Sequence, residues 1–291
     1  MRIFVTGASG FIGSALVPEL VAAGHQVLGL ARSDAAAQSV AAAGAQVHRG
    51  SIEDLDTLRT GAAAADAVIH TAFIHDFSRF QENCEIDRLA IVAMGDALAG
   101  TDKLLIVTSG TGGVHTPGRL TTEDDAPNSP MPRVSEQTAE ALAAQGVRTA
   151  VIRLPQVHDT VKQGLVTYAI QIAREKGVSA YIGDGLNRWP AAPRFDASHL
   201  YRLALEKGES GVRYHAVAEE GVPMRAIAEA IGRGLRIPVV SLTPEQAPAH
   251  FGWLERFAQW DMPASSALTR QRLGWNPTGP TLLTDLANMQ F

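Results

Sequence analysis

The sequence predicts an α/β fold, in which a doubly wound parallel sheet carries helices on both faces and a smaller C-terminal lobe follows. Between residues 2 and 154, short runs of β-forming residues alternate with helical patterns, which is typical of parallel strands joined through helices. After Pro155 this alternation loosens, and from Pro223 short helices alternate with proline-rich turns. The change predicts a second unit that closes over the first, with a ligand in the cleft between them.

The first unit is expected to contain six strands and five helices. The strands are Arg2–Thr6, Gln26–Ala31, Gln46–Arg49, Ala67–Ala72, Leu104–Ser109 and Arg148–Leu154. The helices are Phe11–Ala23, Ala35–Ala43, Asp54–Ala64, Arg79–Ala99 and Ser135–Ala144. Gly24, Gly44 and Gly100 follow three of these helices, where a residue in the left-handed conformation can end a helix.

Beyond Pro155, a helix at Leu165–Glu175 and a strand at Ser179–Ile182 are expected. A helix at Asp196–Glu206 and a strand at Arg213–Val217 resemble a return to the main sheet. We therefore assign residues 1–155 to the first unit, with 179–220 partly returning to it, and residues 156–178 and 221–291 to a cap.

Composition excludes several classes of protein. Hydrophobic residues make up 46% of the 291 residues and charged residues 19%, which suits a globular chain with a large core. The net charge of −5 and the absence of a basic block argue against nucleic acid or a membrane surface as partner. With one cysteine, Cys84, and no signal peptide or membrane-spanning pattern, we expect a cytoplasmic protein. No metal-ligand spacing occurs, so no catalytic metal is expected.

Three glycines follow the first strand and open the first helix. Gly7 permits a tight turn, Gly10 lets backbone N–H groups approach phosphates, and Gly13 lets the helix pack closely on the strand. The positive end of that helix then faces the phosphates. The turn predicts a dinucleotide site, with further contacts from Ser9, Phe11 and Ile12.

This turn and several later segments resemble the short-chain dehydrogenase/reductase superfamily, in particular its extended and atypical members related to nucleotide-sugar epimerases and dihydroflavonol-type reductases. The likeness extends over the whole chain and is most specific at the N-terminus. The matching segments are Thr6-Gly7-Ala8-Ser9-Gly10-Phe11-Ile12-Gly13, Gly24-His25-Gln26-Val27, Ile69-His70-Thr71-Ala72, Val107-Thr108-Ser109, Arg153-Leu154-Pro155 and Phe195-Asp196-Ala197. The resemblance implies a Rossmann-type sheet with a substrate-binding lobe.

Arg32 indicates which dinucleotide is bound. In such folds an acidic residue ending the second strand accepts the ribose hydroxyls of NAD, whereas a nearby arginine accommodates the 2′-phosphate of NADP. Ala31 stands at the acidic position and Arg32 follows it, so we expect NADP(H); a surface arginine without a ligand is the alternative. Ser33 either adds a hydroxyl or caps the next helix. The resemblance implies that the other cofactor contacts are Ser51, Ile52, Thr71, Ala72, Phe73, Thr108, Pro155 and Val157.

The usual catalytic pair of the superfamily is absent. Most relatives use a tyrosine, and a lysine four residues later, to protonate the carbonyl as hydride arrives. The segment Ser135-Glu136-Gln137-Thr138-Ala139-Glu140 places Pro132 at the tyrosine position and Glu136 at the lysine position. None of Tyr168, Tyr181, Tyr201 and Tyr214 has a lysine four residues on.

Other side chains are candidates to replace this pair. Ser109 ends a central strand where relatives keep a hydroxyl for the substrate oxygen; a hydroxyl that satisfies a local turn is the alternative. His75, with Asp76 beside it to orient the ring, and His158 are the candidate proton donors. The residues expected to line the substrate site are Asp76, Thr111, Tyr168, Tyr181 and Trp189.

The sequence therefore favours an NADPH-dependent reductase that transfers hydride to a C=O or C=N bond of a small, hydrophobic organic substrate. An imine fits a site without the tyrosine better than a ketone, because an iminium ion is already protonated. The alternative is an NADP(H)-binding sensor without turnover. A sugar-nucleotide epimerase is disfavoured, because that reaction needs the tyrosine as base. Relatives often dimerise through the helices that correspond to Arg79–Ala99 and Ser135–Ala144, so we expect a homodimer.

Overall fold

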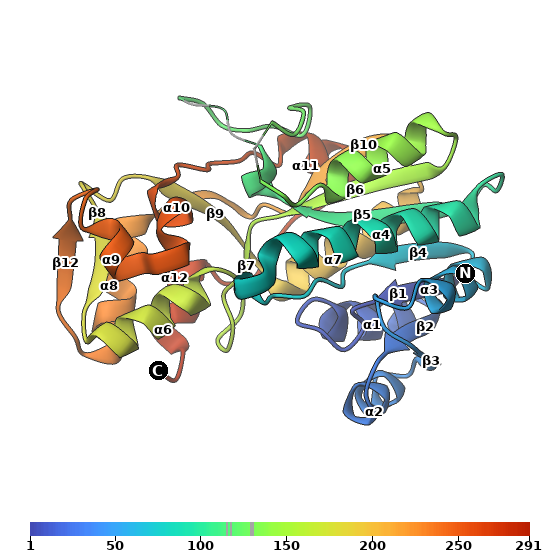
Figure 1. Cartoon of the computed structure of the whole chain (residues 1–291), viewed down its shortest axis with the longest axis horizontal. Helices are drawn as coiled ribbons and strands as arrows, with labels where there is room; N and C mark the ends of the chain where they lie inside the picture. Colours follow the sequence, from blue (N-terminus) through green and yellow to red (C-terminus); the bar gives the residue numbers. More distant parts are fainter. Residues whose placement is uncertain (115, 117, 129–130) are drawn as a thin grey trace.

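The main sheet is parallel, with seven strands in the order β10-β6-β5-β4-β1-β2-β3 (Figure 1). The computed structural model describes residues 1–114, 116, 118–128 and 131–291. The strands are β1 (Arg2–Thr6), β2 (Gln26–Ala31), β3 (Gln46–Arg49), β4 (Ala67–His70), β5 (Leu104–Gly110), β6 (Arg148–Leu154) and β10 (Val212–His215). The order runs outward in both directions from β1 and β4, and ligands bind at such switch points in open α/β sheets. The predicted α/β, doubly wound class is confirmed.

Most strand boundaries agree with the sequence prediction, and β4 differs for a structural reason. It ends at His70 instead of Ala72. Beyond His70, the chain is held to Thr6: the Thr71 N–H and hydroxyl donate to the Thr6 carbonyl at 3.3 and 2.7 Å, and the Ala72 N–H donates to the Thr6 hydroxyl at 3.4 Å. The chain thus leaves the sheet early at its ligand-binding edge.

Helices cover both faces of the sheet, and each face has its own hydrophobic core. One face carries α1 (Gly13–Ala22), α2 (Asp34–Ala42) and α7 (Arg194–Lys207). The other carries α3 (Leu55–Ala63), α4 (Phe80–Leu98) and α5 (Ser135–Ala144). Because the carboxyl ends of parallel strands share one edge, both layers position groups around the same ligand site.

A smaller unit, the cap, lies at one end of the sheet (left in Figure 1). Its three-stranded sheet consists of β7 (Gln156–His158), β9 (Arg188–Pro193) and β11 (Glu219–Pro223), and its two-stranded sheet of β8 (Ser179–Ile182) and β12 (Val239–Leu242). The cap helices are α6 (Val166–Lys176), α8 (Met224–Leu235), α9 (Ala247–Phe251), η3 (Gly252–Leu254), α10 (Glu255–Gln259) and α12 (Leu282–Asn288). These elements enclose a third hydrophobic core.

The segment 179–220 is divided between the two units. Its α7 and β10 join the main sheet layer, where α11 (Ala267–Leu273) packs on both, whereas β8 and β9 pair outside that sheet. Within the described residues, none of the helices is long and apolar enough to cross a membrane.

Candidate active site

The glycine turn between β1 and α1 has the backbone geometry of an anion cradle. Gly7 has a φ of +70°, and the Gly10 N–H donates to the Gly7 carbonyl at 2.8 Å. A Cβ on Gly13 would lie 2.1 Å from that carbonyl oxygen, so glycine is required for α1 to start this close to β1. Among described residues, no backbone carbonyl accepts from the N–H groups of Phe11 and Ile12. These free donors at the positive end of a helix fit a pyrophosphate.

Arg32 extends into solvent from the end of β2. Its guanidinium forms no ion pair or hydrogen bond with the part of the chain that the structure describes. Ser33 caps α2, accepting a backbone N–H at 3.2 Å. Arg49, which sequence reasoning missed, lies beside Ala31 in the sheet register and pairs with Asp34. The end of β2 therefore presents an uncommitted guanidinium, with a second one nearby.

The other predicted cofactor contacts follow the strand ends. Ser51 and Ile52 come after β3; the Ser51 hydroxyl accepts the Glu53 N–H at 3.3 Å, and Ile52 is largely buried. Thr71 and Ala72 are fixed to Thr6 as described above, and Phe73 follows them. Pro155 separates β6 from β7, in which Val157 is buried.

The end of β5 presents Thr108 and Ser109 to opposite sides of the sheet. Successive side chains of a strand alternate in direction, and the preceding residues 104 to 107 alternate between the α7 core and the α4–α5 core. The Thr108 hydroxyl donates to the His70 carbonyl at 2.6 Å and lies 2.7 Å from the Tyr201 hydroxyl. Ser109 therefore faces the α4–α5 side, and its hydroxyl forms no hydrogen bond with a described residue. Thr111 is buried and donates weakly to the Leu154 carbonyl at 3.4 Å.

Glu136, at the position of the missing lysine, belongs to a buried ion cluster. Its carboxylate accepts from Arg153 Nε at 2.8 Å and Arg153 Nη2 at 2.6 Å. Arg213 Nε donates to the same carboxylate at 2.5 Å, and Arg213 also pairs with Glu140. Glu136 is 1% exposed and Arg153 has no exposed surface. The side chain at the lysine position therefore links α5 to β6 and β10.

His75 lies near the ligand edge, but Asp76 does not orient it. Asp76 instead accepts from the Ser78 N–H at 3.0 Å and the Ser78 hydroxyl at 2.6 Å, which corrects the predicted pairing. His75 is exposed, and its Nδ1 lies 3.1 Å from the Phe73 carbonyl oxygen. Loss of hydration, followed by the positive charges of Arg133 and Lys162, lowers the pKa of His75 to about 4. His75 is therefore neutral at pH 7.

His158 lies in the interior and not on the wall of a cleft. It has no exposed surface, and its Nδ1 is 2.6 Å from Asp285 on α12. Its Nε2 lies 3.8 Å from Glu219 and has no hydrogen-bond partner among described residues. As placed, this imidazole cannot touch a substrate.

No group of three or more His, Cys, Asp or Glu among the described residues is arranged to hold a metal ion.

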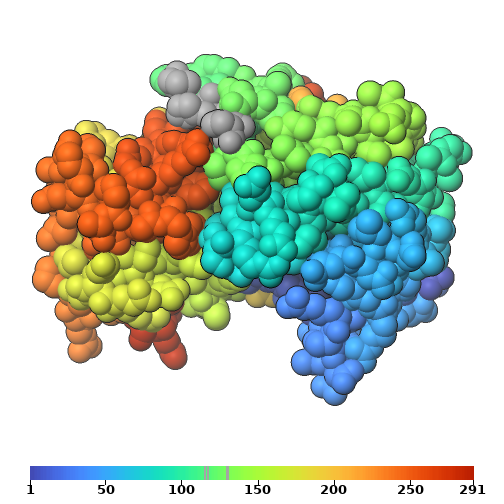
Figure 2. Space-filling view, viewed as in Figure 1, coloured from blue at the N-terminus to red at the C-terminus, as the bar shows by residue number. Residues whose placement is uncertain are grey.

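Aromatic side chains join the sheet unit to the cap beside this edge. Phe77, in the short helix η1 (Phe77–Arg79), stacks on Trp253 at 4.1 Å between ring centroids. Tyr168 of α6 contacts both rings edge-on at 5.3 and 5.1 Å. Figure 2 shows the same junction, where the start of α4 (teal) touches the cap (yellow and orange). These rings form an apolar wall near Phe73.

Two predicted substrate contacts lie elsewhere in the cap. Trp189 has no exposed surface, and its indole N–H donates to the Phe257 carbonyl at 3.1 Å. It is a core residue of the cap, which corrects its predicted contact with substrate. Tyr181 belongs to β8, at the outer end of the cap (Figure 1), and lies under Arg225.

Arg133, near Phe73, is a second residue that the sequence did not single out. It follows Pro132 directly and precedes α5. Its guanidinium lies 4.2 Å from the Phe73 ring centroid and donates to the Thr108 carbonyl at 3.1 Å. Its place beside the tyrosine position was the available signal, but motif matching considers only the tyrosine and lysine themselves.

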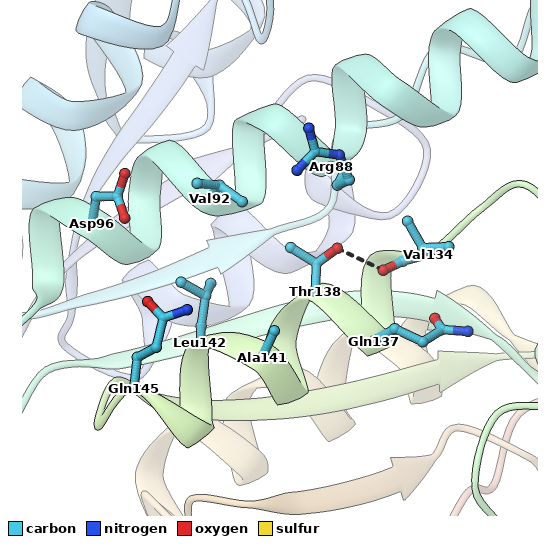
Figure 3. A pocket seen from close by; sticks show the side chains of 9 residues that line it. All are labelled: Arg88, Val92, Asp96, Val134, Gln137, Thr138, Ala141, Leu142 and Gln145. Atoms are coloured by element: carbon cyan, nitrogen blue, oxygen red, sulfur yellow. Dashed lines mark hydrogen bonds between the residues drawn. The ribbon is translucent and has the colours of Figure 1, made fainter.

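A shallow groove of about 370 Å³ lies away from this edge, between α4 and α5 (Figure 3). Its lining residues come from the two helices and the turn before α5: Arg88, Val92, Asp96, Val134, Gln137, Thr138, Ala141, Leu142 and Gln145. The groove is a feature of the helix layer and is separate from the dinucleotide cradle.

Comparisons with known proteins agree with this geometry. The model of the NAD dependent epimerase/dehydratase family matches residues 3–218. An uncharacterised protein of Schizosaccharomyces pombe is 52% identical over 99% of both chains. A 4-hydroxy-2-methyl-3-oxo-4-farnesyl-3,4-dihydroquinoline-1-oxide ketoreductase of Stigmatella aurantiaca is 28% identical, covering 87% of this chain and 80% of its own. The UDP-glucose 4-epimerase of Thermus thermophilus, solved with NAD, has a TM-score of 0.76 at 19% identity, over 99% of this chain and 97% of its own.

Proposed function

Because the chain belongs to the NAD dependent epimerase/dehydratase family, we propose that it is an NADPH-dependent reductase that transfers hydride to a C=O or C=N bond of a small, hydrophobic organic substrate. The observation that carries the proposal is the alignment of three features along one sheet edge. These are the glycine cradle, the uncommitted Arg32 at one end, and the free Ser109 hydroxyl at the end of β5.

The residues present have distinct tasks in this reaction. The N–H groups of Phe11 and Ile12 bind the pyrophosphate, and Arg32 binds the 2′-phosphate. NADPH, when bound, supplies the hydride. Ser109 donates a hydrogen bond to the acceptor atom, and the stacked Phe77 and Trp253 rings shield one side of this edge from bulk water. Water delivers the final proton, because His75 is neutral at pH 7.

One relative and the residues at the motif positions support reduction rather than sugar epimerisation. The Stigmatella aurantiaca relative is named a ketoreductase. Pro132 and Glu136 replace the tyrosine and lysine, and Glu136 is committed to Arg153 and Arg213. Epimerisation requires the tyrosine as a base. The same commitment of Glu136 supports the second candidate, an NADP(H) sensor without turnover.

The composition also supports proposals about the location and the partners of the protein. We propose a cytoplasmic enzyme whose partner is a small molecule and not nucleic acid or a membrane, as the net charge of −5 supports.

We also propose a homodimer, with the groove between α4 and α5 as the contact. Light scattering of wild type and of a Gln137→Arg variant tests the dimer.

Binding and turnover assays test the function. The protein is titrated with NADPH and NADH and then screened for cofactor oxidation with ketones, aldehydes and cyclic imines. We expect tighter binding of NADPH and turnover of at least one class. Ser109→Ala lowers that turnover by at least about tenfold, because a lost oxyanion-type donor costs roughly 2–4 kcal/mol. Tight binding of NADPH without any turnover would refute the reductase and support the sensor.

A further inference from the structure

We propose that Arg133 binds the acceptor oxygen in place of the missing tyrosine–lysine pair, and that the acceptor is therefore a neutral carbonyl and not a cationic iminium. This inference rests on the proposed function and narrows its substrate class. It reverses the preference for an imine that the sequence suggested.

The Arg133 guanidinium is held on three sides and free on one. Nε donates to the Ser135 hydroxyl at 3.0 Å, and Nη2 donates to the Thr108 carbonyl at 3.1 Å. One face of the guanidinium lies over the Phe73 ring at 4.2 Å. Within the described chain, Nη1 has no hydrogen-bond partner. The two N–H donors of Arg133 Nη1 are thus available to a ligand.

A buried polar chain behind Arg133 keeps it in this orientation. The Ser135 hydroxyl that accepts from Arg133 donates in turn to Asp87 at 2.5 Å. The other oxygen of Asp87 lies 3.1 Å from His70 Nε2, and His70 Nδ1 lies 2.7 Å from the Thr6 hydroxyl. Asp87 and His70 are almost fully buried. Such support fixes the donor before the substrate arrives, which is the condition for electrostatic catalysis.

Arg133 and Ser109 converge on the same side of the sheet. Arg133 holds the carbonyl of Thr108, the residue before Ser109, and both Ser109 and the start of α5 lie on the α4–α5 face. Two donors therefore lie on the same face at the end of β5: a neutral hydroxyl and a guanidinium. This pair matches an oxygen that gains negative charge.

Positive charge at this edge disfavours an iminium. Arg133 and Lys162 both contribute to the low pKa of His75, and the buried Asp87 carboxylate, 4.0 Å from Arg133 Nε, opposes them. Two cations and one carboxylate therefore act on this space. Lys162 Nζ also lies 5.8 Å from the centroid of the Phe11 ring, in the glycine turn. A bound cation would meet like charges there, whereas a carbonyl oxygen would meet donors.

The chemistry balances with the cofactor of the proposed function. The carbonyl carbon gains the hydride with its two electrons, and the π pair of the C=O bond moves onto the oxygen. Arg133 Nη1 and the Ser109 hydroxyl donate hydrogen bonds to this alkoxide, which then takes a proton from water. NADPH is oxidised to NADP⁺ and the carbonyl is reduced to an alcohol.

The first test needs no turnover. Benzoate, a carboxylate on an apolar ring, serves as a probe for the oxyanion and is titrated into the NADP⁺-loaded protein. Wild type is expected to bind it, with roughly tenfold or greater weakening in Arg133→Gln and a smaller loss in Arg133→Lys, as the removal of a charged hydrogen bond implies. Arg59→Gln, on the exposed surface of α3, is the matched control and leaves the affinity unchanged. Equal affinity in wild type and folded Arg133→Gln, or no binding to wild type, would overturn the assignment.

Two further readouts separate this role from a structural one. NMR titration of His75 should show a higher pKa in Arg133→Gln than in wild type, and NADPH affinity should stay the same in both. Turnover of a ketone should fall about 10²-fold in Arg133→Gln, while a preformed cyclic iminium should remain a poor substrate of wild type. An iminium reduced faster than every carbonyl would overturn the proposal. If neither a carbonyl nor an imine is reduced, the proposed function fails, and the benzoate result still decides the role of Arg133.

Discussion

Restoring the lysine of the superfamily should destabilise this chain without creating activity. Glu136→Lys replaces a carboxylate that is 1% exposed and bridges Arg153 and Arg213. Once it is gone, the buried Arg153 keeps only neutral partners, among them the Asp125 carbonyl at 2.6 Å and His215 at 3.1 Å. The new ammonium adds a third positive charge to the cluster.

The size of the stability loss in Glu136→Lys follows from the burial of the ion pair. Breaking a buried ion pair by removing one partner costs about 3–5 kcal/mol. For chains of this size each kcal/mol lowers Tm by about 2–4 °C, so Tm should fall by about 6–20 °C. Thermal unfolding of Glu136→Lys, with Glu136→Gln beside it, measures the loss.

Glu140→Gln is the matched control in the same cluster. Glu140 also pairs with Arg213, but its side chain is 42% exposed, and exposed ion pairs contribute less than about 1 kcal/mol. If Glu136→Lys unfolds within about a degree of wild type, the cluster is not a stabilising link between α5, β6 and β10. Turnover gained by a Pro132→Tyr, Glu136→Lys double variant would refute the view that this site works without the pair.

Three further predictions concern the cofactor edge. Arg32→Ala should weaken NADPH about tenfold or more and leave NADH unchanged, because a charge-assisted bond to phosphate contributes roughly 1.5–3 kcal/mol; equal losses for both cofactors in fluorescence titrations would contradict it. Gly13→Ala should abolish binding of both cofactors, since its Cβ would lie 2.1 Å from the Gly7 carbonyl oxygen; calorimetry showing wild-type affinity would disprove the cradle. The pKa of His75 is lowered from 6.5 to about 4, so the unfolded chain binds more protons between these values and stability declines as pH falls through that window. His75→Asn should flatten this slope in chemical denaturation at pH 7 and pH 5, and an unchanged slope would show that His75 is not the titrating group.

Local pattern was enough to predict the sheet and the cradle. The bounds of β1, β2, β3 and β6 agree with the sequence prediction. β1, β2 and β6 have apolar centres, and β3, whose one apolar residue is Val47, is bordered by Gly44 and Gly50. The glycine turn is equally local, since Gly7, Gly10 and Gly13 act through backbone geometry within a few residues. For the same reason the sequence indicated α/β topology and a dinucleotide site.

The chemistry of the site depends on partners far apart in the chain. His158 and Asp285 are 127 positions apart, and their contact turns a candidate proton donor into an interior residue. Asp76 pairs with a neighbour two residues away instead of with His75. Sequence periodicity does not indicate which hydrogen-bond partner a side chain takes, because the partner is decided when side chains compete for space and hydrogen bonds during packing.

The positions without the catalytic tyrosine and lysine show most clearly what the sequence determines and what the tertiary structure decides. Pro132 and Glu136 could be read directly as an absence, since identity at a motif position is a property of the sequence. What stands in their place became visible only in three dimensions: Glu136 joins Arg153 and Arg213, and Arg133 lies over Phe73 with one side of its guanidinium free. A guanidinium acquires its role from the carbonyls, rings and carboxylates that surround it, and for Arg133 those come from the loop after β4, from β5, α4 and α5 together.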